Sequence, residues 1–143
     1  MTGPDRRHLD LLAAHRNGVL VTLRRDGRPQ LSNVIYAFDA TGDRVLVSVT
    51  AGRAKTRNAA RDPRVSLHVS TPDFWSWVVA DGSAELSPAA GDPHDPTVEQ
   101  LVALYRSLSG EHPDWADYRA AMVRDQRQVL SFTVTHTYGQ LPE

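Results

Sequence analysis

The spacing of apolar positions changes from a helical to a strand period early in the chain. Leu9, Leu12 and Ala13 fall at i, i+3 and i+4, which predicts a short helix over residues 3–16. Strand-like runs follow over residues 18–38 and are interrupted by an Asp-Gly pair, a strong hairpin signal. The chain is therefore expected to begin with a helix and a β-hairpin.

The rest of the chain alternates between strand and helix patterns in an irregular order. Strands are predicted over residues 45–50, 64–71, 73–86 and 128–139, and helices over residues 51–62, 97–110 and 113–125. The aromatic strand that contains "FWSWV" is expected to bulge or bend at Asp81-Gly82. Hairpins dominate, and the order lacks the regular strand–helix–strand repeat of a doubly wound sheet. We therefore expect a mainly β fold with flanking helices, in which an antiparallel sheet closes into a barrel.

Length and composition predict a single globular domain over residues 1–143. The net charge of -1 argues against a general nucleic-acid binder, because such proteins usually carry a strongly basic face. No apolar run approaches the roughly 18 residues that a membrane span needs, and the polar N-terminus lacks the apolar stretch of a signal peptide. The sequence has no cysteine, hence no disulfide and no thiolate metal ligand. A cytoplasmic protein is expected.

One short segment concentrates positive charge where a helix is expected to begin. Residues 51–62 contain Arg53, Lys55, Arg57 and Arg61, and Lys55 is the only lysine of the chain. Cations in a first helical turn oppose the helix dipole, and like charges four residues apart repel each other. A bound anion would reverse both penalties, because free N–H groups and a threonine hydroxyl stand at the same place. The segment is either a phosphate cradle or a solvated basic face, and the residues alone leave both open.

Two further stretches carry side chains that suit a planar ligand. Gln30, Ser32 and Asn33 place polar groups in a predicted strand, where they either meet solvent or contact the edge of a heteroaromatic ring. Trp75 and Trp77 share one face of their predicted strand. They are either core or dimer contacts, or a flat wall beside such a ring. Taken alone, both stretches favour the structural role.

No group of residues indicates a metal centre or a catalytic acid and base. The six histidines are scattered without the spacing of a zinc site, and neither a nucleophile elbow nor a P-loop occurs. Glu111 and His112 are adjacent, but they lie in a predicted loop between two helices, where a catalytic pair is not favoured. We therefore predict no metal and assign no catalytic residue.

Four blocks of sequence, in this order, resemble a known family. They are "GVLVTLRRDGRPQLSNV", "RAKTRNAARDPRVSL", "WSWVVADGSAEL" and "ALYRSLSGEHPDWADYRAAMVRDQRQVL", and with them the resemblance covers nearly the whole chain. The chain resembles the split β-barrel flavin-binding proteins related to pyridoxamine 5'-phosphate oxidase. It is more closely similar to their actinobacterial branch, the reductases that depend on the deazaflavin coenzyme F420. The resemblance implies a six-stranded antiparallel Greek-key barrel that acts as a homodimer, with the cofactor at the subunit interface.

The resemblance also implies roles for individual residues. The cofactor phosphate would be held by Arg53, Lys55 and Thr56, with help from Arg57. The ring system would be lined by Gln30, Ser32, Asn33, Val47, Ser48 and Val49.

Two pairs of residues are expected at the ends of the ligand. Trp75 and Trp77 would approach the ring or the substrate from the partner subunit, as the resemblance implies. Arg24 and Arg28 are assigned by charge and by their position at the barrel rim, where they would meet the acidic glutamyl tail of F420.

The expected function is that of an F420-dependent oxidoreductase, which transfers a hydride to a small organic substrate that the sequence does not identify. Pyridoxamine phosphate oxidases carry a C-terminal Arg-rich segment that holds the substrate phosphate, whereas this sequence ends "THTYGQLPE". Three alternatives remain. They are an FMN-dependent oxidoreductase of the same fold, a flavin or deazaflavin carrier without turnover, and a structural dimer that binds neither cofactor.

Overall fold

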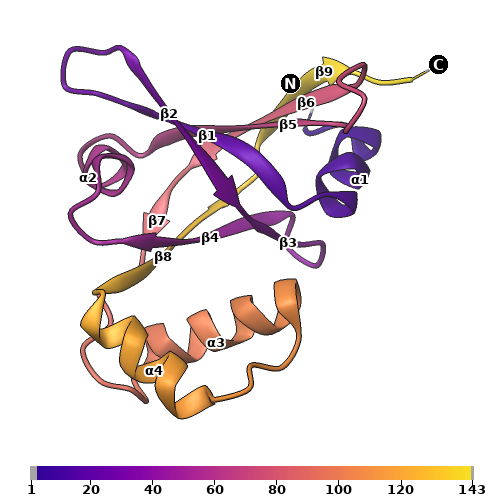
Figure 1. Cartoon of the computed structure of the whole chain (residues 1–143). Helices are drawn as coiled ribbons and strands as arrows, with labels where there is room; N and C mark the ends of the chain where they lie inside the picture. Colours follow the sequence, from indigo (N-terminus) through magenta and orange to yellow (C-terminus); the bar gives the residue numbers. More distant parts are fainter. Residues whose placement is uncertain (1–2, 143) are drawn as a thin grey trace.

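The computed structural model describes residues 3–142 and arranges them as two antiparallel β-sheets with helices around them (Figure 1). The strands are β1 (Asn17–Leu23), β2 (Pro29–Ile35), β3 (Ala37–Asp39), β4 (Arg44–Thr50), β5 (Arg64–Ser70), β6 (Trp77–Ser83), β7 (Glu85–Leu86), β8 (Arg127–Thr133) and β9 (His136–Gln140). The helices are α1 (Arg6–Ala14), α2 (Ala54–Arg61), α3 (Pro96–Ser109) and α4 (Trp115–Arg124). Over the described range, no helix combines the length and the apolar character needed to cross a membrane.

Three long strands bend and continue from one sheet into the other. One sheet has the strand order β2-β1-β5-β6-β9, and the other has the order β3-β4-β8-β7. The chain passes between them at Tyr36, at Ala84 and at residues 134–135, so that β2 and β3, β6 and β7, and β8 and β9 are each two parts of one strand. The short strands therefore combine into six long ones, which confirms the predicted antiparallel split barrel with flanking helices. The single strand predicted over residues 128–139 is instead two strands in different sheets.

Close packing near one of these corners requires a glycine. The predicted bend at Asp81-Gly82 is wrong, because β6 pairs with β5 without a break along its whole length and the chain turns only at Ala84. Gly82 instead lies against β8, where a Cβ atom would come within 2.5 Å of the Phe132 ring and of the Thr133 carbonyl oxygen. Glycine is the residue that allows the two strands to approach this closely.

The aromatic segment before β6 is a turn, so the first part of the predicted long aromatic strand is wrong. Asp73 accepts hydrogen bonds from the Thr71 hydroxyl (2.6 Å) and from the Trp75 N–H (3.0 Å), and Phe74 has a φ of 71°. An aspartate that bonds its own neighbourhood offers the backbone an alternative to the sheet ladder. Trp75 therefore lies in the turn and Trp77 begins β6, so the two side chains do not share a strand face.

Helix α1 covers one open side of the barrel. Leu9, Leu11 and Leu12 are buried there, whereas Ala13, which the helical spacing groups with Leu9 and Leu12, is exposed. Tyr36 is fully buried at the corner between β2 and β3, and its hydroxyl donates a 2.7 Å hydrogen bond to the Leu12 carbonyl oxygen. Burial raises the pKa of this phenol. The hydrogen bond satisfies the buried phenol hydroxyl and joins the corner to α1.

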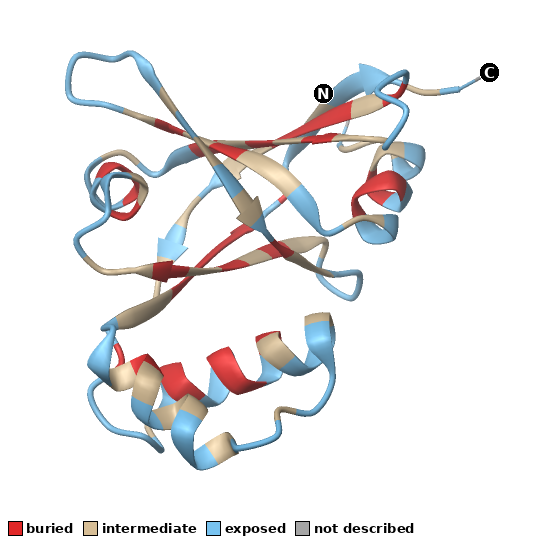
Figure 2. Ribbon diagram, in the orientation of Figure 1, coloured by how far each residue is buried: buried red, intermediate tan, exposed pale blue. Residues whose placement is uncertain are grey.

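Helices α3 and α4 form a hairpin over the outer face of the four-stranded sheet, and Figure 2 shows the buried face of α3 turned toward that sheet. A second hydrophobic cluster lies between them, distinct from the barrel core. In it, Val98, Leu101, Val102 and Met122 pack with Val129 of β8. The hairpin is therefore a second layer attached to β4 and β8.

Asp95 caps α3, and we expect this helix to depend on it. Its carboxylate accepts hydrogen bonds from the N–H groups of Gly91 (2.8 Å), Val98 (2.8 Å) and Asp92 (3.1 Å), and these bonds lower its pKa. Asp95→Ala should lower the free energy of unfolding by about 1–2 kcal/mol, whereas Asp95→Asn keeps an accepting oxygen and should lose less. Because the pKa is lowered in the folded state, this stabilisation is present above about pH 4 and is lost as the pH falls further. Urea unfolding at neutral pH measures the difference, and equal losses in both variants would contradict the cap.

Candidate functional site

Helix α2 begins at the end of the loop after β4 and has no capping side chain. Arg53 occupies the N-cap position without a side-chain capping bond, and Gly52 before it has a φ of 87°, which favours glycine. The first turn therefore presents backbone N–H groups without an internal partner. Thr56, predicted to hold a phosphate, donates its hydroxyl proton to the Thr50 carbonyl oxygen at 2.9 Å. Its side chain thus fixes the loop before α2 and has no proton to offer an anion.

A cleft of about 690 Å³ opens between the start of α2, the edge strand β2, β4 and the α3–α4 hairpin. This volume is typical of a site for a cofactor or small molecule. The lining residues are Arg16, Asn17, Asn33, Val34, Ile35, Val47, Ser48, Lys55, Leu104, Tyr105, Leu108, Ser109, Tyr118, Met122 and Arg127. They include three cations and no aspartate or glutamate, although the whole chain carries 17 acidic and 16 basic residues. The cleft therefore favours an anionic ligand.

Lys55 and Arg127 form the cationic end of this cleft, and Arg53 lies nearby. Burial lowers the pKa of Lys55, and the positive charges of Arg53 and Arg127 lower it further. The Nε atom of Arg127 is buried and has no hydrogen-bond partner among residues 3–142. Neighbouring like charges and an unpaired buried donor are both unfavourable, and an anion in the cleft would relieve both.

The remainder of the cleft is mainly apolar. The helices contribute Leu104, Leu108 and Met122, and β2 contributes Val34. Amide and hydroxyl side chains from β1, β2 and β4 stand among them. An apolar slot with a few polar groups and one cationic end suits a flat ring system that carries an anionic tail.

An aromatic cluster holds the helical wall of the cleft in place. The rings of Tyr105 and Tyr118 lie 5.1 Å apart between centroids, and His112 and Trp115 pack against both. The Tyr118 hydroxyl donates a 3.0 Å hydrogen bond to the Leu101 carbonyl oxygen of α3. Burial raises the pKa of Tyr118, and the nearby positive charge of Arg127 partly offsets this increase. The hydrogen bond and the ring contacts join α4 to α3, so this wall is preformed.

The residues predicted to line the ring separate along β4. Asn33, Val47 and Ser48 line the cleft, whereas Val49 does not. Consecutive residues of a strand point to opposite faces, so three in a row cannot present their side chains to one ligand. Ser48 is partly exposed toward the cleft, and Val47 and Val49 belong to the barrel core. The side chain of Val49 is therefore not available to a ligand in the cleft.

Gln30 and Ser32 lie on the face of β2 opposite to Asn33, as strand alternation requires. The structure therefore does not bring these three predicted ring contacts together. Arg28, predicted with Arg24 at the glutamyl tail, is exposed in the hairpin turn. A second, basic depression of about 600 Å³ lies on the other side of α2 and includes Arg24, Arg25, Gln30, Arg57 and Arg61.

Trp75 and Trp77 lie outside the cleft of their own chain. Trp77 stacks on His68 with 5.8 Å between ring centroids and meets the Tyr138 ring edge-on at 6.0 Å. The Trp75 side chain is in the exposed turn, where 76% of its surface is accessible. A contact of either tryptophan with a ligand in the cleft requires a second subunit and stays a prediction.

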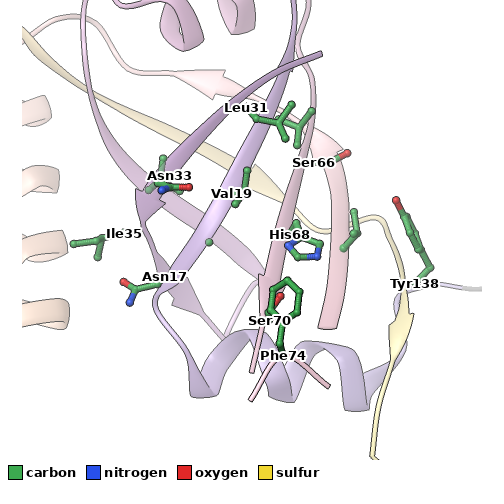
Figure 3. A pocket seen from close by; sticks show the side chains of 14 residues that line it. Asn17, Val19, Leu31, Asn33, Ile35, Ser66, His68, Ser70, Phe74 and Tyr138 are labelled. Carbon is green, nitrogen blue, oxygen red and sulfur yellow. The ribbon is translucent and has the colours of Figure 1, made fainter. Parts of the chain in front are cut away.

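A broad groove of about 980 Å³ runs over the outer face of the five-stranded sheet (Figure 3). A sheet face that meets only water usually carries mostly polar residues. This face exposes large apolar side chains instead, with accessible fractions of 60% for Leu31, 59% for Ile35, 78% for Phe74 and 49% for Tyr138. The groove and the cleft meet along β1 and β2, where they share Asn17, Asn33, Val34 and Ile35.

The geometry does not support a catalytic pair at Glu111 and His112. The Glu111 carboxylate accepts a 2.7 Å hydrogen bond from Arg106, and His112 packs in the aromatic cluster. Neither residue lines the cleft. No group of three or more potential metal ligands occurs in the part of the chain that the structure describes.

Arg127 is the main residue of the cleft that sequence reasoning missed. It is the first residue of β8 and pairs with Thr50, the last residue of β4, directly before the loop that leads to α2. The local sequence shows only an arginine between a helix and a strand, which does not indicate a site. The register of β8 against β4 brings it to Lys55, and that register is not visible in either strand alone.

Comparison with known proteins gives one family and a set of similar folds. The sequence model described as pyridoxamine 5'-phosphate oxidase matches residues 4–141. Among solved structures, a conserved hypothetical protein from Mycobacterium tuberculosis is similar, with 22% identity over 100% of this chain and 91% of its own, and a TM-score of 0.72.

Two of the similar structures are of proteins that are named for their cofactor. An F420 reductase is 26% identical over 90% of this chain and 94% of its own, with a TM-score of 0.62. A FAD-binding protein from Mesorhizobium loti is 20% identical over 94% of this chain and 90% of its own, with a TM-score of 0.66. The Mesorhizobium and Mycobacterium structures support the fold.

Proposed function

Because this chain belongs to the pyridoxamine 5'-phosphate oxidase family, we propose that it binds coenzyme F420 in the cleft and uses the reduced cofactor to reduce a small organic molecule. The observation that carries the proposal is the cleft itself, an apolar slot whose cationic residues face no acid. F420 combines a flat deazaflavin ring with a phosphodiester and an acidic tail, which match these two parts. The similarity to an F420 reductase at 26% identity supports the choice of cofactor.

The residues of the cleft bind and orient the cofactor rather than supply an acid or a base. Lys55 and Arg53 would hold the phosphate, and Asn33 and Ser48 would contact the ring edge. The bound deazaflavin supplies the hydride chemistry. The helical wall, with Leu104 and Met122, would exclude water from one side of the ring. Among residues 3–142, no carboxylate and no imidazole lines the cleft, so none of them is assigned to protonate the product.

We further propose that the protein works as a homodimer joined through the apolar groove. The groove exposes large apolar side chains that a second copy would cover, and it runs into the cleft along β2. A partner placed there would close the open side of the cleft and bring its own Trp75 and Trp77 near the ligand. The cofactor would then lie at the subunit interface, as the resemblance implies.

Separate titrations with F420 and FMN, followed by ligand fluorescence, test the proposed function. We expect F420 to bind at least about tenfold more tightly than FMN, because only F420 adds acidic groups that the basic depression beyond α2 can attract. The reverse order would move the protein to the FMN-dependent oxidoreductases. Binding of neither cofactor would overturn the proposal and leave the structural dimer.

A second measurement separates an enzyme from a carrier. Reduced F420 should be oxidised in the presence of a panel of reducible small molecules, at a rate that depends on the protein. Tight binding without any turnover over a broad panel would instead favour a deazaflavin carrier.

A further inference from the structure

We propose that Arg127 completes the anion site of the cleft by binding the phosphate of the ligand together with Lys55. This inference deepens the proposed function and rests on it for the ring-bearing ligand, but the anion site is testable with phosphate compounds alone. It assigns a binding role to a residue outside the basic segment of residues 51–62.

The backbone holds Arg127 at the place where the anion is expected. The β4–β8 pairing sets Arg127 opposite Thr50, and the next residue of the loop, Ala51, donates its N–H to the Gln126 carbonyl oxygen at 3.0 Å. The loop that starts there leads directly to the N-cap of α2. The backbone of Arg127 is therefore held beside this loop by strand pairing rather than by a flexible segment.

The side chain of Arg127 has an unmet hydrogen-bonding requirement. Its Nε atom is buried without a partner in the described part of the chain, although buried polar groups in folded proteins are almost always paired. A guanidinium presents several N–H donors in a planar fork, which matches two oxygens of a phosphate. An oxyanion in the cleft would supply the missing acceptor.

The surroundings of Arg127 also distinguish it from the surface arginines. Several of those pair with acids, as Arg64 does with Asp62 at 2.8 Å and Arg106 with Glu111 at 2.7 Å. Arg127 has Lys55 as its charged neighbour in the cleft, and no acid of the described part of the chain lines that space. Two cations held together without a counter-ion are unfavourable unless a ligand provides the negative charge.

The basic depression on the other side of α2 does not show the same features. Arg24 there pairs with Asp26 at 3.1 Å, and Arg61 donates to the Leu23 carbonyl oxygen at 2.7 Å and to the Asn58 side chain at 3.0 Å. These guanidinium groups already have partners in the chain. The unpaired donor therefore points to the cleft as the site of a tightly held phosphate.

Ligand pairs that differ by a phosphate test the inference. Arg127→Gln should raise the Kd for FMN or F420 by about tenfold, because a hydrogen bond between charged groups is lost. Its Kd for riboflavin, which lacks the phosphate, should stay within about twofold of wild type. Arg127→Lys keeps the positive charge but loses the planar guanidinium. Its Kd for FMN or F420 should therefore lie between those of the wild type and of Arg127→Gln. Arg124→Gln, an exposed arginine three residues earlier, serves as the matched control and should bind all ligands as wild type does.

Two results would overturn the inference. One is an unchanged Kd for the phosphate-bearing ligand in Arg127→Gln; the other is an equal loss for FMN and riboflavin, which would indicate a structural role. Circular dichroism and the Tm of each unliganded variant show whether the fold is intact. If Arg127→Gln fails to fold, Arg127→Lys takes its place in this comparison. An unchanged preference of Arg127→Lys for FMN over riboflavin would then contradict the inference.

Inorganic pyrophosphate separates this inference from the proposed function. At matched ionic strength, pyrophosphate should raise the Tm of the wild-type protein, and Arg127→Gln should lose that increase. If neither F420 nor FMN binds but the pyrophosphate effect requires Arg127, the cofactor proposal fails while the anion site stands. If pyrophosphate has no effect on the wild-type Tm and no cofactor binds, both fail.

Discussion

Replacing Lys55 with alanine is expected to weaken the binding of F420, or of FMN if that is the cofactor, by about 10- to 150-fold, equivalent to 1.5–3 kcal/mol for a charge-assisted contact. Lys55 is half-buried at the cationic end of the cleft, and no acid of the lining competes with a ligand for its charge. Fluorescence titration of the wild-type and variant proteins measures the change directly.

Arg57 provides the matched control for Lys55. It is a basic residue two positions later on the same helix, but it lines the depression on the other side of α2. Because FMN has no acidic tail to meet that depression, Arg57→Ala should change the affinity for FMN by less than about threefold, the size of a screened surface charge. Equal losses in Lys55→Ala and Arg57→Ala would show that general positive charge, and not the cleft, attracts the ligand.

The pH dependence of binding gives an independent measure of the role of Lys55. Its pKa is lowered in the unliganded protein by burial and by Arg53 and Arg127, so its proton is lost at a lower pH than that of an ordinary lysine. A bound anion favours the charged form and raises this pKa. Between the two pKa values binding takes up a proton, so affinity should fall as the pH rises. Lys55→Ala should lack this alkaline decrease, and the same decrease in both proteins would contradict the assignment.

The stability of the unliganded protein should change with pH in the opposite direction and increase as the pH rises. A lysine whose pKa is lowered on folding destabilises the folded state while it is charged. This penalty begins to decrease as the pH rises above the lowered pKa, and it is gone only above the pKa of an ordinary lysine. Without ligand at neutral pH, Lys55→Ala should therefore be no less stable than wild type by urea unfolding. Loss of binding with retained stability is the combination that identifies a ligand-binding residue.

The strand pattern of the sequence predicted the barrel but not the points at which its strands change sheets. Apolar residues continue at every second position from Val34 through Tyr36 to Phe38, so the sequence pattern does not mark that change of sheet. Phe132 and Val134 continue the spacing up to the second change in the same way. The bend predicted at Gly82 was placed at the glycine, whereas the chain turns two residues later and needs that glycine for close packing against Phe132. Such corners depend on contacts between distant strands, which local sequence does not encode.

The sequence predicted those site residues that belong to short motifs, and it missed or misplaced those whose position depends on strand pairing. Lys55 and Asn33 were expected from short motifs, and both line the cleft. Val49 and Gln30 were assigned to the same ligand as their neighbours, although strand alternation sends them to the core and to the other side of α2. Arg127 was missed because strand register, rather than sequence proximity, places it beside Lys55.

The connection between the groove and the cleft makes the oligomeric state a functional question. Asn17, Asn33, Val34 and Ile35 belong to both surfaces, so a partner that covered this part of the groove would also form part of the cleft. In a two-fold symmetric dimer the same patch covers itself, and each copy completes the cleft of the other. A monomer would leave the ring-binding slot open to water along β2.

Leu31→Asp should therefore convert a dimer into a monomer and weaken cofactor binding at the same time. Leu31 is 60% exposed and lines the groove but not the cleft, so a loss of binding would report the loss of the partner rather than of a direct contact. Two-fold symmetry places two new carboxylates in one apolar interface, which should weaken association by about a hundredfold or more.

Analytical ultracentrifugation and cofactor titration on the same samples measure both effects of Leu31→Asp. Ala103→Asp introduces the same charge at an exposed position of α3, and it should leave association and binding unchanged. A wild-type protein that is monomeric at micromolar concentration yet binds the cofactor tightly would show that one chain completes the site. The exposed apolar face would then need another occupant, and the two tryptophans would have no part in the cleft.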